Sequence, residues 1–348
     1  MPTTSVCDWP RAGGPPRGSA VLRQAPEDFQ VEEVLNFSPS GEGQHVLVLI
    51  RKRDANTEWV ARQLALHAGI GRKAVGYAGL KDRRAVTEQW FSVDLAGARE
   101  PDWSQLDGDE VTVLQHRRHH RKLRQGAVQA NRFRITLRAL RGECEYLEQT
   151  LQRVTSQGVP NYFGEQRFGR NNLQQAAAML LQGRSVRDRF KRGIYLSAAR
   201  SLLFNRVLAK RVVDGNWDRA LVGDVMMLAG SHSIFSCPES DADIARRLAE
   251  GDIHPTGPLW GCGNTPCHAE AAALEEEALS AETSWCRALE EVGLKHQRRA
   301  LRVIPQALQW RLADDDSLTL TFTLPSGCYA TSVLREVVGF REKIQEER

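Results

Sequence analysis

The segment Gly76–Gln89 (GYAGLKDRRAVTEQ) combines residue types that suit covalent catalysis by a carboxylate. Asp82 stands between cations, with Lys81 before it and two arginines after it. An opposite charge nearby favours the ionised form of a carboxyl group, and nucleophilic attack requires an ionised, oriented carboxylate. The same pattern also fits a polar turn whose aspartate caps a helix or pairs with a neighbour. Taken alone, the segment favours the turn.

Other chemistry-bearing residues form no second recognisable centre. The sequence contains neither a Walker-type glycine-rich loop nor a GxGxxG motif, and it has no nucleophile-elbow pattern. Cys262 lies close to Cys267 and His268, but no second pair of ligands follows at zinc-finger spacing. We therefore expect no cofactor and no metal ion, and we expect a carboxylate to carry any catalysis.

The net charge of +4 conceals an uneven distribution of basic residues. The stretch from His116 to Gly142 contains no acidic residue and nine cations. These are Arg117, Arg118, Arg121, Lys122, Arg124, Arg132, Arg134, Arg138 and Arg141. So dense a basic stretch predicts a surface that contacts phosphates. Four cations of a predicted helix would extend it, although a solvated helix face fits them equally: Arg200, Arg206, Lys210 and Arg211.

Composition argues against a membrane or secreted protein. No apolar run approaches the roughly 20 residues of a membrane span, and the start MPTTSVCDWPRAGGPPRGS has no apolar signal-peptide core. The seven cysteines are odd in number and scattered, which argues against a disulfide framework. No long heptad or uncovered apolar strand calls for a protein partner. We expect a cytoplasmic monomer.

Hydrophobic periodicity predicts both strands and helices. The apolar run His45–Ile50 predicts a strand covered on both faces, and Asn131–Leu140 alternates between apolar residues and arginines or threonine. Further strands are expected at Trp90–Val93 and Leu318–Leu324. Helices are expected at Thr57–His67, Asn172–Gln182, Ser197–Val213, Asp241–Glu250 and Ala269–Val292, with Thr57 and Ser197 as N-caps.

The predicted strands are split between the two ends of the chain, with a mostly helical stretch between them. That pattern is typical of one domain inserted into another. We expect residues 1–157 and 304–348 to form one domain, and residues 158–303 to form the inserted domain.

The run GLKDRRAVTEQW resembles the signature of the tRNA pseudouridine synthase D family, in which a glycine and a Lys-Asp pair precede AxTxQ. Further motifs of that family match in the same order over nearly the whole chain. They are APEDFQVEE, GEGQH at Gly41–His45, HRRHHRKLRQGAVQANRFRI, GVPNYFGEQRFGR at Gly158–Arg170, and LPSGCYATSVLRE at Leu324–Glu336. Together they replace the turn interpretation of Asp82.

The resemblance implies an α/β (α+β) fold. A pseudouridine synthase catalytic domain with a mixed, mainly antiparallel sheet would carry an inserted α/β domain specific to the family. It also implies an isomerase that converts uridine to pseudouridine in tRNA, at position 13. The uridine must be flipped out of the RNA stack, at a cost of a few kcal/mol.

Residues that match family motifs receive roles from the resemblance. Asp82 would be the nucleophile, attacking either C6 of the base or C1′ of the sugar. Phe29 would lie against the flipped base, and Asn131 would hydrogen-bond the amide-like edge of uracil. Phe133 would take the place of a tyrosine found in other pseudouridine synthases.

Two features of the implied site stay open. Arg23, at a position that is often lysine in the family, and Lys81 are alternative cation partners for Asp82. The family's late aromatic residue, commonly phenylalanine, is Tyr329 here. Its ring still suits stacking, but its hydroxyl needs a partner if buried.

Two other functions compete with this interpretation. A non-catalytic RNA-binding or folding module would use the same basic surface without changing the RNA. A glycoside hydrolase would pair Asp82 with Glu32 or Glu33, but neutral sugars require no cationic groove.

Overall fold

The computed structural model of the chain describes residues 8–169, 171–239 and 241–342. The chain divides into two compact units. The sheet unit comprises Arg17–Glu143, Pro305–Gly327 and Val338–Arg348. The helical unit comprises Met1–Pro16, Cys144–Ile304 and Cys328–Val337. The helical unit therefore takes in more of the chain than the insertion expected at residues 158–303.

The sheet unit is built on a ten-stranded mixed sheet. Its main path runs through β14 (Gln306–Ala313), β15 (Ser317–Pro325), β7 (Val128–Gly142), β2 (Phe29–Leu35), β5 (Val86–Asp94), β3 (His45–Arg53) and β6 (Val111–His119). Three strands lie off this path: β1 (Gly18–Leu22), β16 (Gly339–Glu342) and β4 (Val75–Tyr77). Among the described pairings, β1–β16 and β2–β5 are parallel and the others antiparallel. The expected mixed, mainly antiparallel sheet is confirmed.

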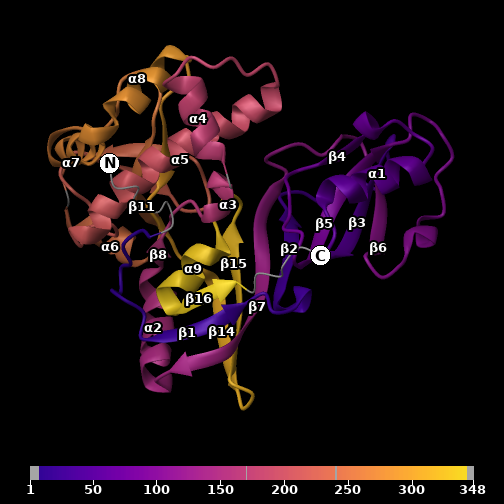
Figure 1. Ribbon diagram of the computed structural model, residues 1–348, viewed down its shortest axis with the longest axis horizontal. Coiled ribbons are helices and arrows are strands. Elements are labelled where there is room, and N and C mark those ends of the chain that lie inside the picture. Colours follow the sequence, from indigo (N-terminus) through magenta and orange to yellow (C-terminus); the bar gives the residue numbers. More distant parts are fainter. Residues whose placement is uncertain (1–7, 170, 240, 343–348) are drawn as a thin grey trace. The chain divides into compact units, whose positions relative to one another are not determined.

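Helix α1 (Thr57–His67) packs on one face of β3 and β5, as Figure 1 shows. Residues two apart on a strand face the same side, so Val48 and Ile50 of β3 meet Val60 and Leu64 of the helix. On the other face of β3, Leu47 packs in a smaller cluster with Trp90 and Leu123. The strand is thus covered on both faces at this point, as its apolar run predicts. Short 3₁₀ turns complete the sheet unit: η1 (Pro26–Asp28), η2 (Arg72–Ala74) and η3 (Trp103–Leu106).

Strand β3 is three residues longer than its apolar run. Its pairing with β5 continues as far as Arg53, and its pairing with β6 as far as Lys52. The alternation continues as well: Arg51 and Arg53 are exposed, whereas Lys52 is 0% exposed. A hydrophobicity rule ends the strand at Ile50 because the next three residues are all cationic, although the backbone ladder does not stop there.

The helical unit contains a four-stranded sheet and a two-stranded one. The first runs β10 (Ile234–Cys237), β9 (Asp224–Leu228), β11 (Ile253–Leu259) and β12 (Gln297–Ala300), and the second pairs β8 (Val159–Pro160) with β13 (Arg302–Val303). Its helices are α2 (Cys144–Gln157), α3 (Glu165–Phe168), α4 (Asn172–Leu180), α5 (Arg189–Val213), α6 (Ala242–Ala249), α7 (Ala269–Leu279), α8 (Thr283–Glu291) and α9 (Ala330–Val337). Helix α5 packs against α4, α7 and β11 (Figure 1). Within the described residues, no helix combines the length and apolar character needed to cross a membrane.

Three expected helix details are wrong. Helix α5 begins eight residues before Ser197, where the Asp188 carboxylate caps the N–H groups of Phe190 and Lys191 at 2.9 and 3.2 Å. The cationic first turns of this helix lack apolar periodicity, which hid its start. The stretch 269–292 is broken by the 3₁₀ turn η4 (Ser280–Glu282). Thr57 is the first residue of α1 and not its N-cap, which is Asn56.

Candidate active site

Asp82 lies in the loop between β4 and β5, where a buried arginine holds its carboxylate. The Nη2 atom of Arg23 is 2.5 Å from Oδ2 of Asp82, and Nη1 is 2.5 Å from Oε1 of Glu342 on β16. The Arg23 side chain is 7% exposed and the Asp82 side chain 29%. The backbone of Arg23 has a φ of +56°, a conformation that residues other than glycine adopt at an energetic cost. The nucleophile candidate is therefore fixed by a buried cation while part of it remains accessible.

Lys81 is bound to a different carboxylate. Its Nζ atom lies 2.5 Å from Oε1 of Glu33 on β2, whose side chain is 0% exposed. The other oxygen of Glu33 accepts the main-chain N–H of Trp90 at 2.9 Å. Of the two cations that the sequence offered, Arg23 contacts Asp82 and Lys81 ties the loop to the strand beside it.

Two buried side chains bind the main chain of the Asp82 loop from beneath. The hydroxyl of Thr57 accepts the main-chain N–H of Lys81 at 3.0 Å and donates to Oε1 of Gln89 at 3.0 Å. The amide nitrogen of Gln89 donates to the carbonyl of Gly79 at 2.7 Å. Thr57, expected to cap a helix, instead anchors the loop. Neither anchor was identified from the sequence, because both contacts are made between elements.

Three rings line up across neighbouring strands beside this loop. Phe29, at the start of β2, meets Phe133 of β7 edge to face with 6.2 Å between centroids, and Phe133 stacks on Phe322 of β15 at 5.4 Å. The guanidinium of Arg23 lies 4.1 Å above the centroid of the Phe29 ring. A cation over an aromatic face is attracted by the ring quadrupole, so Phe29 helps to hold the partner of Asp82. Phe322 lies in the alternating run LTLTFTL, which predicts a strand, but this ring was not predicted to belong to the site.

Asn131 brings an unmatched hydrogen-bond acceptor to the same side of the sheet. It lies on β7 opposite Glu33 of β2 and Leu324 of β15. Its Oδ1 atom is buried and has no hydrogen-bond partner among the residues that the structure describes. A buried unsatisfied acceptor costs about 1–3 kcal/mol. An N–H donor on a bound molecule would remove that cost.

Tyr329 belongs to the helical unit and is described by its own surroundings. Its hydroxyl accepts a hydrogen bond from Nε of Arg167 at 2.9 Å, and its ring meets Phe163 with centroids 6.1 Å apart. Arg167 also donates to the hydroxyl of Ser197 at 2.9 Å. The extra hydroxyl of this tyrosine thus has the partner it needs, and the Ser197 hydroxyl joins α5 to Arg167 of α3.

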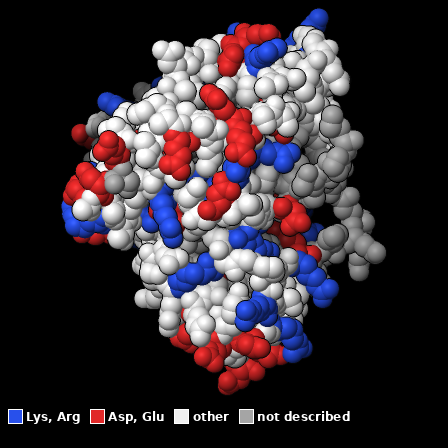
Figure 2. Space-filling view, turned by 90° about the vertical axis from the view of Figure 1, so that its left-hand side faces the viewer, with Lys and Arg blue, Asp and Glu red and all other residues white. Residues whose placement is uncertain are grey.

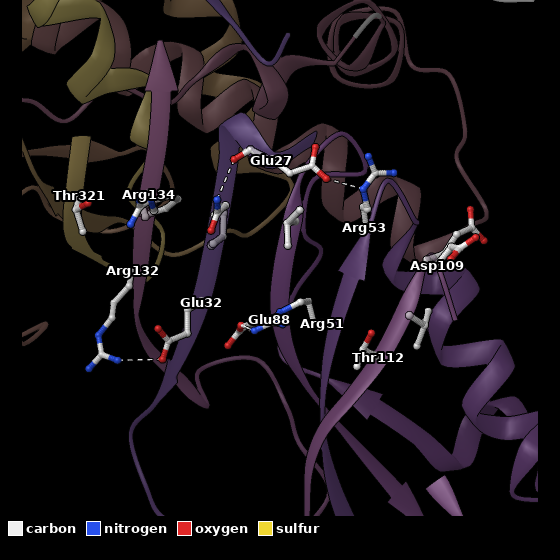
Figure 3. A pocket seen from close by; sticks show the side chains of 16 residues that line it. Glu27, Glu32, Arg51, Arg53, Glu88, Asp109, Thr112, Arg132, Arg134 and Thr321 are labelled. Carbon is white, nitrogen blue, oxygen red and sulfur yellow. Dashed lines mark hydrogen bonds and ion pairs between the residues drawn. The ribbon is translucent and has the colours of Figure 1, made fainter. Parts of the chain in front are cut away.

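The arginine face of β7 is a mixed-charge surface. Arg132 and Arg134 line a pocket of about 720 Å³, which we call the open trough (Figure 3). Arg132 pairs with Glu32 at 2.9 Å, and Arg51 and Arg53 pair with Glu88 and Glu27. Acidic and basic side chains are also interspersed on the face seen in Figure 2. The phosphate-contacting strand expected from the sequence therefore has its charges largely matched.

The position of Glu32 in the trough bears on glycoside hydrolysis as well. Glu32 faces away from the side that carries Glu33, because adjacent strand residues point to opposite faces. Glu33 itself is held by Lys81. Neither carboxylate is placed as a free second acid or base beside Asp82.

The four helix cations expected to extend a basic surface are engaged within the helical unit. Arg200 donates to the carbonyls of Leu259 and Lys295, and Arg206 pairs with Glu282. Lys210 pairs with Asp214 and Glu277, while Arg211 is buried against Asp224.

Exposed cations lie instead around the start of α5: Arg187, Arg189, Lys191 and Arg192. Beside them the Phe190 ring is 68% exposed. Sequence reading missed this group, although the density of the run RDRFKR carried the signal.

A smaller pocket of about 210 Å³ adjoins the partner of Asp82. Arg23, Arg53 and Arg84 line it, together with Asp54 and the segment 24–26. Carboxylates already pair with two of these three guanidinium groups: Asp82 and Glu342 with Arg23, and Glu27 with Arg53.

Metal ligands were tested within the residues that the structure describes. No group of three or more histidine, cysteine, aspartate and glutamate side chains there is arranged to hold a metal ion. Cys267 is buried and its thiol contacts Glu275 at 3.3 Å, while Cys262 is exposed.

Comparisons with known proteins extend over almost the whole chain. The sequence profile of the tRNA pseudouridine synthase D (TruD) family matches residues 14–187 and 184–337. The tRNA pseudouridine synthase D of Methylococcus capsulatus is 49% identical over 335 residues, 96% of this chain and 95% of that protein. That of Nitrosococcus oceani is 48% identical, with 95% and 94% covered. The crystal structure of the putative tRNA pseudouridine synthase D of Methanosarcina mazei gives a TM-score of 0.68 at 22% identity, covering 96% and 95% of the two chains, a likeness of fold.

Proposed function

The chain belongs to the tRNA pseudouridine synthase D (TruD) family, and on that premise we propose that it isomerises uridine to pseudouridine in tRNA, at position 13. In this reaction the bond between N1 and C1′ breaks, the base turns, and a bond between C5 and C1′ forms. The C5 hydrogen leaves as a proton and N1 ends protonated, so the isomerisation consumes no oxidant or reductant.

The observation that carries this proposal is the held but accessible carboxylate of Asp82. Arg23 fixes one of its oxygens at 2.5 Å, and 29% of the Asp82 side chain remains exposed. A nucleophile must be oriented and must also be reachable by the substrate. Attack at C6 of the base and attack at C1′ of the sugar are both compatible with this arrangement.

Asn131 and the neighbouring rings supply the proposed recognition of uracil. The unmatched Oδ1 of Asn131 suits the N3–H of the base, and its amide nitrogen suits a uracil carbonyl. Phe133 supplies an aromatic ring where other pseudouridine synthases have tyrosine. Phe29 supports the Arg23 guanidinium in addition to bordering the base. In the helical unit, Tyr329 would meet the substrate through its ring, since its hydroxyl is bound to Arg167.

One group of exposed cations is proposed to contact the RNA backbone. The exposed cations around the start of α5 suit phosphates, and the exposed Phe190 ring suits an unpaired base. These contacts would add binding strength that falls as salt concentration rises.

We further propose residues 1–157 and 304–348 as the catalytic domain and residues 158–303 as the inserted, family-specific domain. The residues 1–157 and 304–348 expected for the catalytic domain include all of the proposed nucleophile's contacts described above. A cytoplasmic monomer remains our proposal for the state in which the enzyme meets tRNA.

The first test uses tRNA labelled with tritium at C5 of uridine. Asp82→Asn should retain tRNA binding and lose tritium release, because the amide is a poor nucleophile. Asp316→Asn, a control at an exposed aspartate paired with Arg141, should release tritium at the wild-type rate. Full release by Asp82→Asn would refute the role of Asp82.

The second test separates the enzyme from a non-catalytic RNA-binding module. Carbodiimide mapping would locate pseudouridine in tRNA from cells with and without the protein. The enzyme predicts loss of one pseudouridine, at position 13. An unchanged pattern, together with salt-sensitive tRNA binding, would favour the binding module.

A further inference from the structure

We propose that Lys52 is a positioning residue for Asp82, holding the main chain of the nucleophile in place from inside the sheet unit. This inference rests on the function proposed above. Lys52 belongs to none of the family motifs quoted above. It lies on β3, and α1, η2 and β4 separate that strand from the Asp82 loop along the chain.

Lys52 makes its hydrogen bonds from a buried position on β3. The residue is 0% exposed and points from β3 to the same side as Val48 and Ile50. Its Nζ atom donates to the carbonyl oxygen of Asp82 at 2.7 Å and to that of Ala55 at 2.8 Å. Hydrogen bonds from a charged donor are roughly twice as strong as those between neutral groups. One ammonium therefore ties the end of a rigid strand to the backbone of the nucleophile.

Arg23 and Lys52 consequently hold different parts of Asp82. Arg23 binds its carboxylate, and Lys52 binds its carbonyl. The ion pair with Arg23 acts on the carboxylate and does not itself fix the position of the main chain of Asp82. The contact with Lys52 limits the position of the Cα atom, so that the direction of the carboxylate is defined. Together with Thr57 and Gln89, Lys52 makes the loop an extension of the packed core.

A structural role alone does not explain a lysine at this position. Burial lowers the pKa of Lys52 to about 8. The charge of Lys81 also lowers this pKa, whereas the charges of Asp82 and Asp54 raise it. Removing an ammonium from water is costly, and a well-packed apolar side chain is often at least as stable in its place. Methionine has a similar length and carries no charge. The ammonium is thus an energetic burden for the fold and a benefit for the geometry of Asp82.

The test compares Lys52→Met with Ile50→Val in the full-length protein. Both substitutions change the same face of the same strand. The Ile50 side chain is apolar and cannot form a hydrogen bond to the Asp82 loop, whereas Lys52 donates one. Single-turnover tritium release, with enzyme in excess over C5-labelled tRNA, measures the chemical step. Filter binding measures tRNA affinity, and thermal unfolding shows that each variant is folded at the assay temperature.

We expect Lys52→Met to slow the single-turnover step by about 100-fold, the order of loss that a displacement of about 1 Å causes in a reacting group. Its tRNA affinity should stay within about threefold of wild type, since the side chains proposed to contact the RNA backbone lie elsewhere. Ile50→Val should keep the wild-type rate. A Lys52→Met rate within about threefold of wild type, or an equal loss in Ile50→Val, would overturn the proposal.

A second readout follows the loop itself. Lys81, Arg83 and Arg84 make the loop a target for trypsin, and both arginines are exposed. Lys52→Met should be cut there faster than wild type or Ile50→Val under native conditions, as mass spectrometry of early fragments would show. Unchanged cleavage together with an unchanged rate would show that Lys52 does not hold the loop. If the wild-type protein itself released no tritium, the proposed function would fail, an outcome distinct from failure of the Lys52 inference.

Discussion

The two faces of the ten-stranded sheet place the same residue types in opposite physical situations. On the Asp82 side, ions such as Lys52 and Glu33 are fully buried, and each has a defined partner. In the open trough, pairs such as Arg51 with Glu88 are exposed to water. Water and salt weaken exposed pairs to about 0–1 kcal/mol, whereas a buried ion left alone costs several. The charges that position chemistry are therefore the buried ones.

Glu33 and Glu32 should show the largest contrast between the faces, because they are neighbours on one strand. Glu33→Gln leaves the Lys81 ammonium without its counter-charge and should lower the free energy of unfolding by about 3–5 kcal/mol. Glu32→Gln breaks an exposed pair with Arg132 and should lower it by less than about 1 kcal/mol. Urea titration of both variants measures the difference. Equal losses would show that burial does not separate the two faces.

The stability of the protein should rise with pH where Lys52 releases its proton. Its pKa is about 8 in the folded protein and 10.5 in the unfolded chain. Between these values the unfolded state binds the extra proton, so the free energy of unfolding increases with pH, by up to roughly 3 kcal/mol. Below pH 8 the lysine is charged in both states and contributes no slope. Urea titrations from pH 7 to 10.5 should show this slope in wild type and not in Lys52→Met; a shared slope would assign it to other groups.

Variants of Arg23 and Arg51 test whether the catalytic rate depends on one face of the sheet and not on the other. Arg23→Met removes the cation that fixes the Asp82 carboxylate and should slow single-turnover tritium release by about 100-fold. Arg23→Lys should recover part of that loss because it restores the charge. Arg51→Met, in the open trough, should leave the rate unchanged. Similar rates for the two methionine variants would remove Arg23 from the site.

The smallest effect is expected at Arg132, whose charge Glu32 matches across the strands. Arg132→Ala should change tRNA affinity by less than about twofold and leave its salt dependence unaltered, because the Glu32 carboxylate already matches the charge of Arg132. Filter binding over a range of salt concentrations measures both quantities. A tenfold weaker affinity with a shallower salt dependence would make the trough an RNA surface.

The strand alternation of β3 shows how close sequence reading came to the Lys52 contact. Counting on from Val48 and Ile50 places Lys52 on the buried face and Arg51 and Arg53 on the exposed one. Three cations in succession instead indicated the end of the strand. Hydrophobicity identifies a buried position only when an apolar residue fills it, so a buried lysine escapes that rule.

The ordered motifs of the sequence by themselves determined the family, the mixed sheet and Asp82 as the candidate nucleophile, because residue type and local spacing are properties of the chain. The partner of Asp82 was decided only by the tertiary structure. Arg23 and Lys81 are both cations, and only the packing of β1, β2 and the loop brings one to Asp82 and the other to Glu33. The anchors Thr57, Gln89 and Lys52 likewise meet the loop from separate elements, as side-chain contacts between distant segments depend on the folded arrangement.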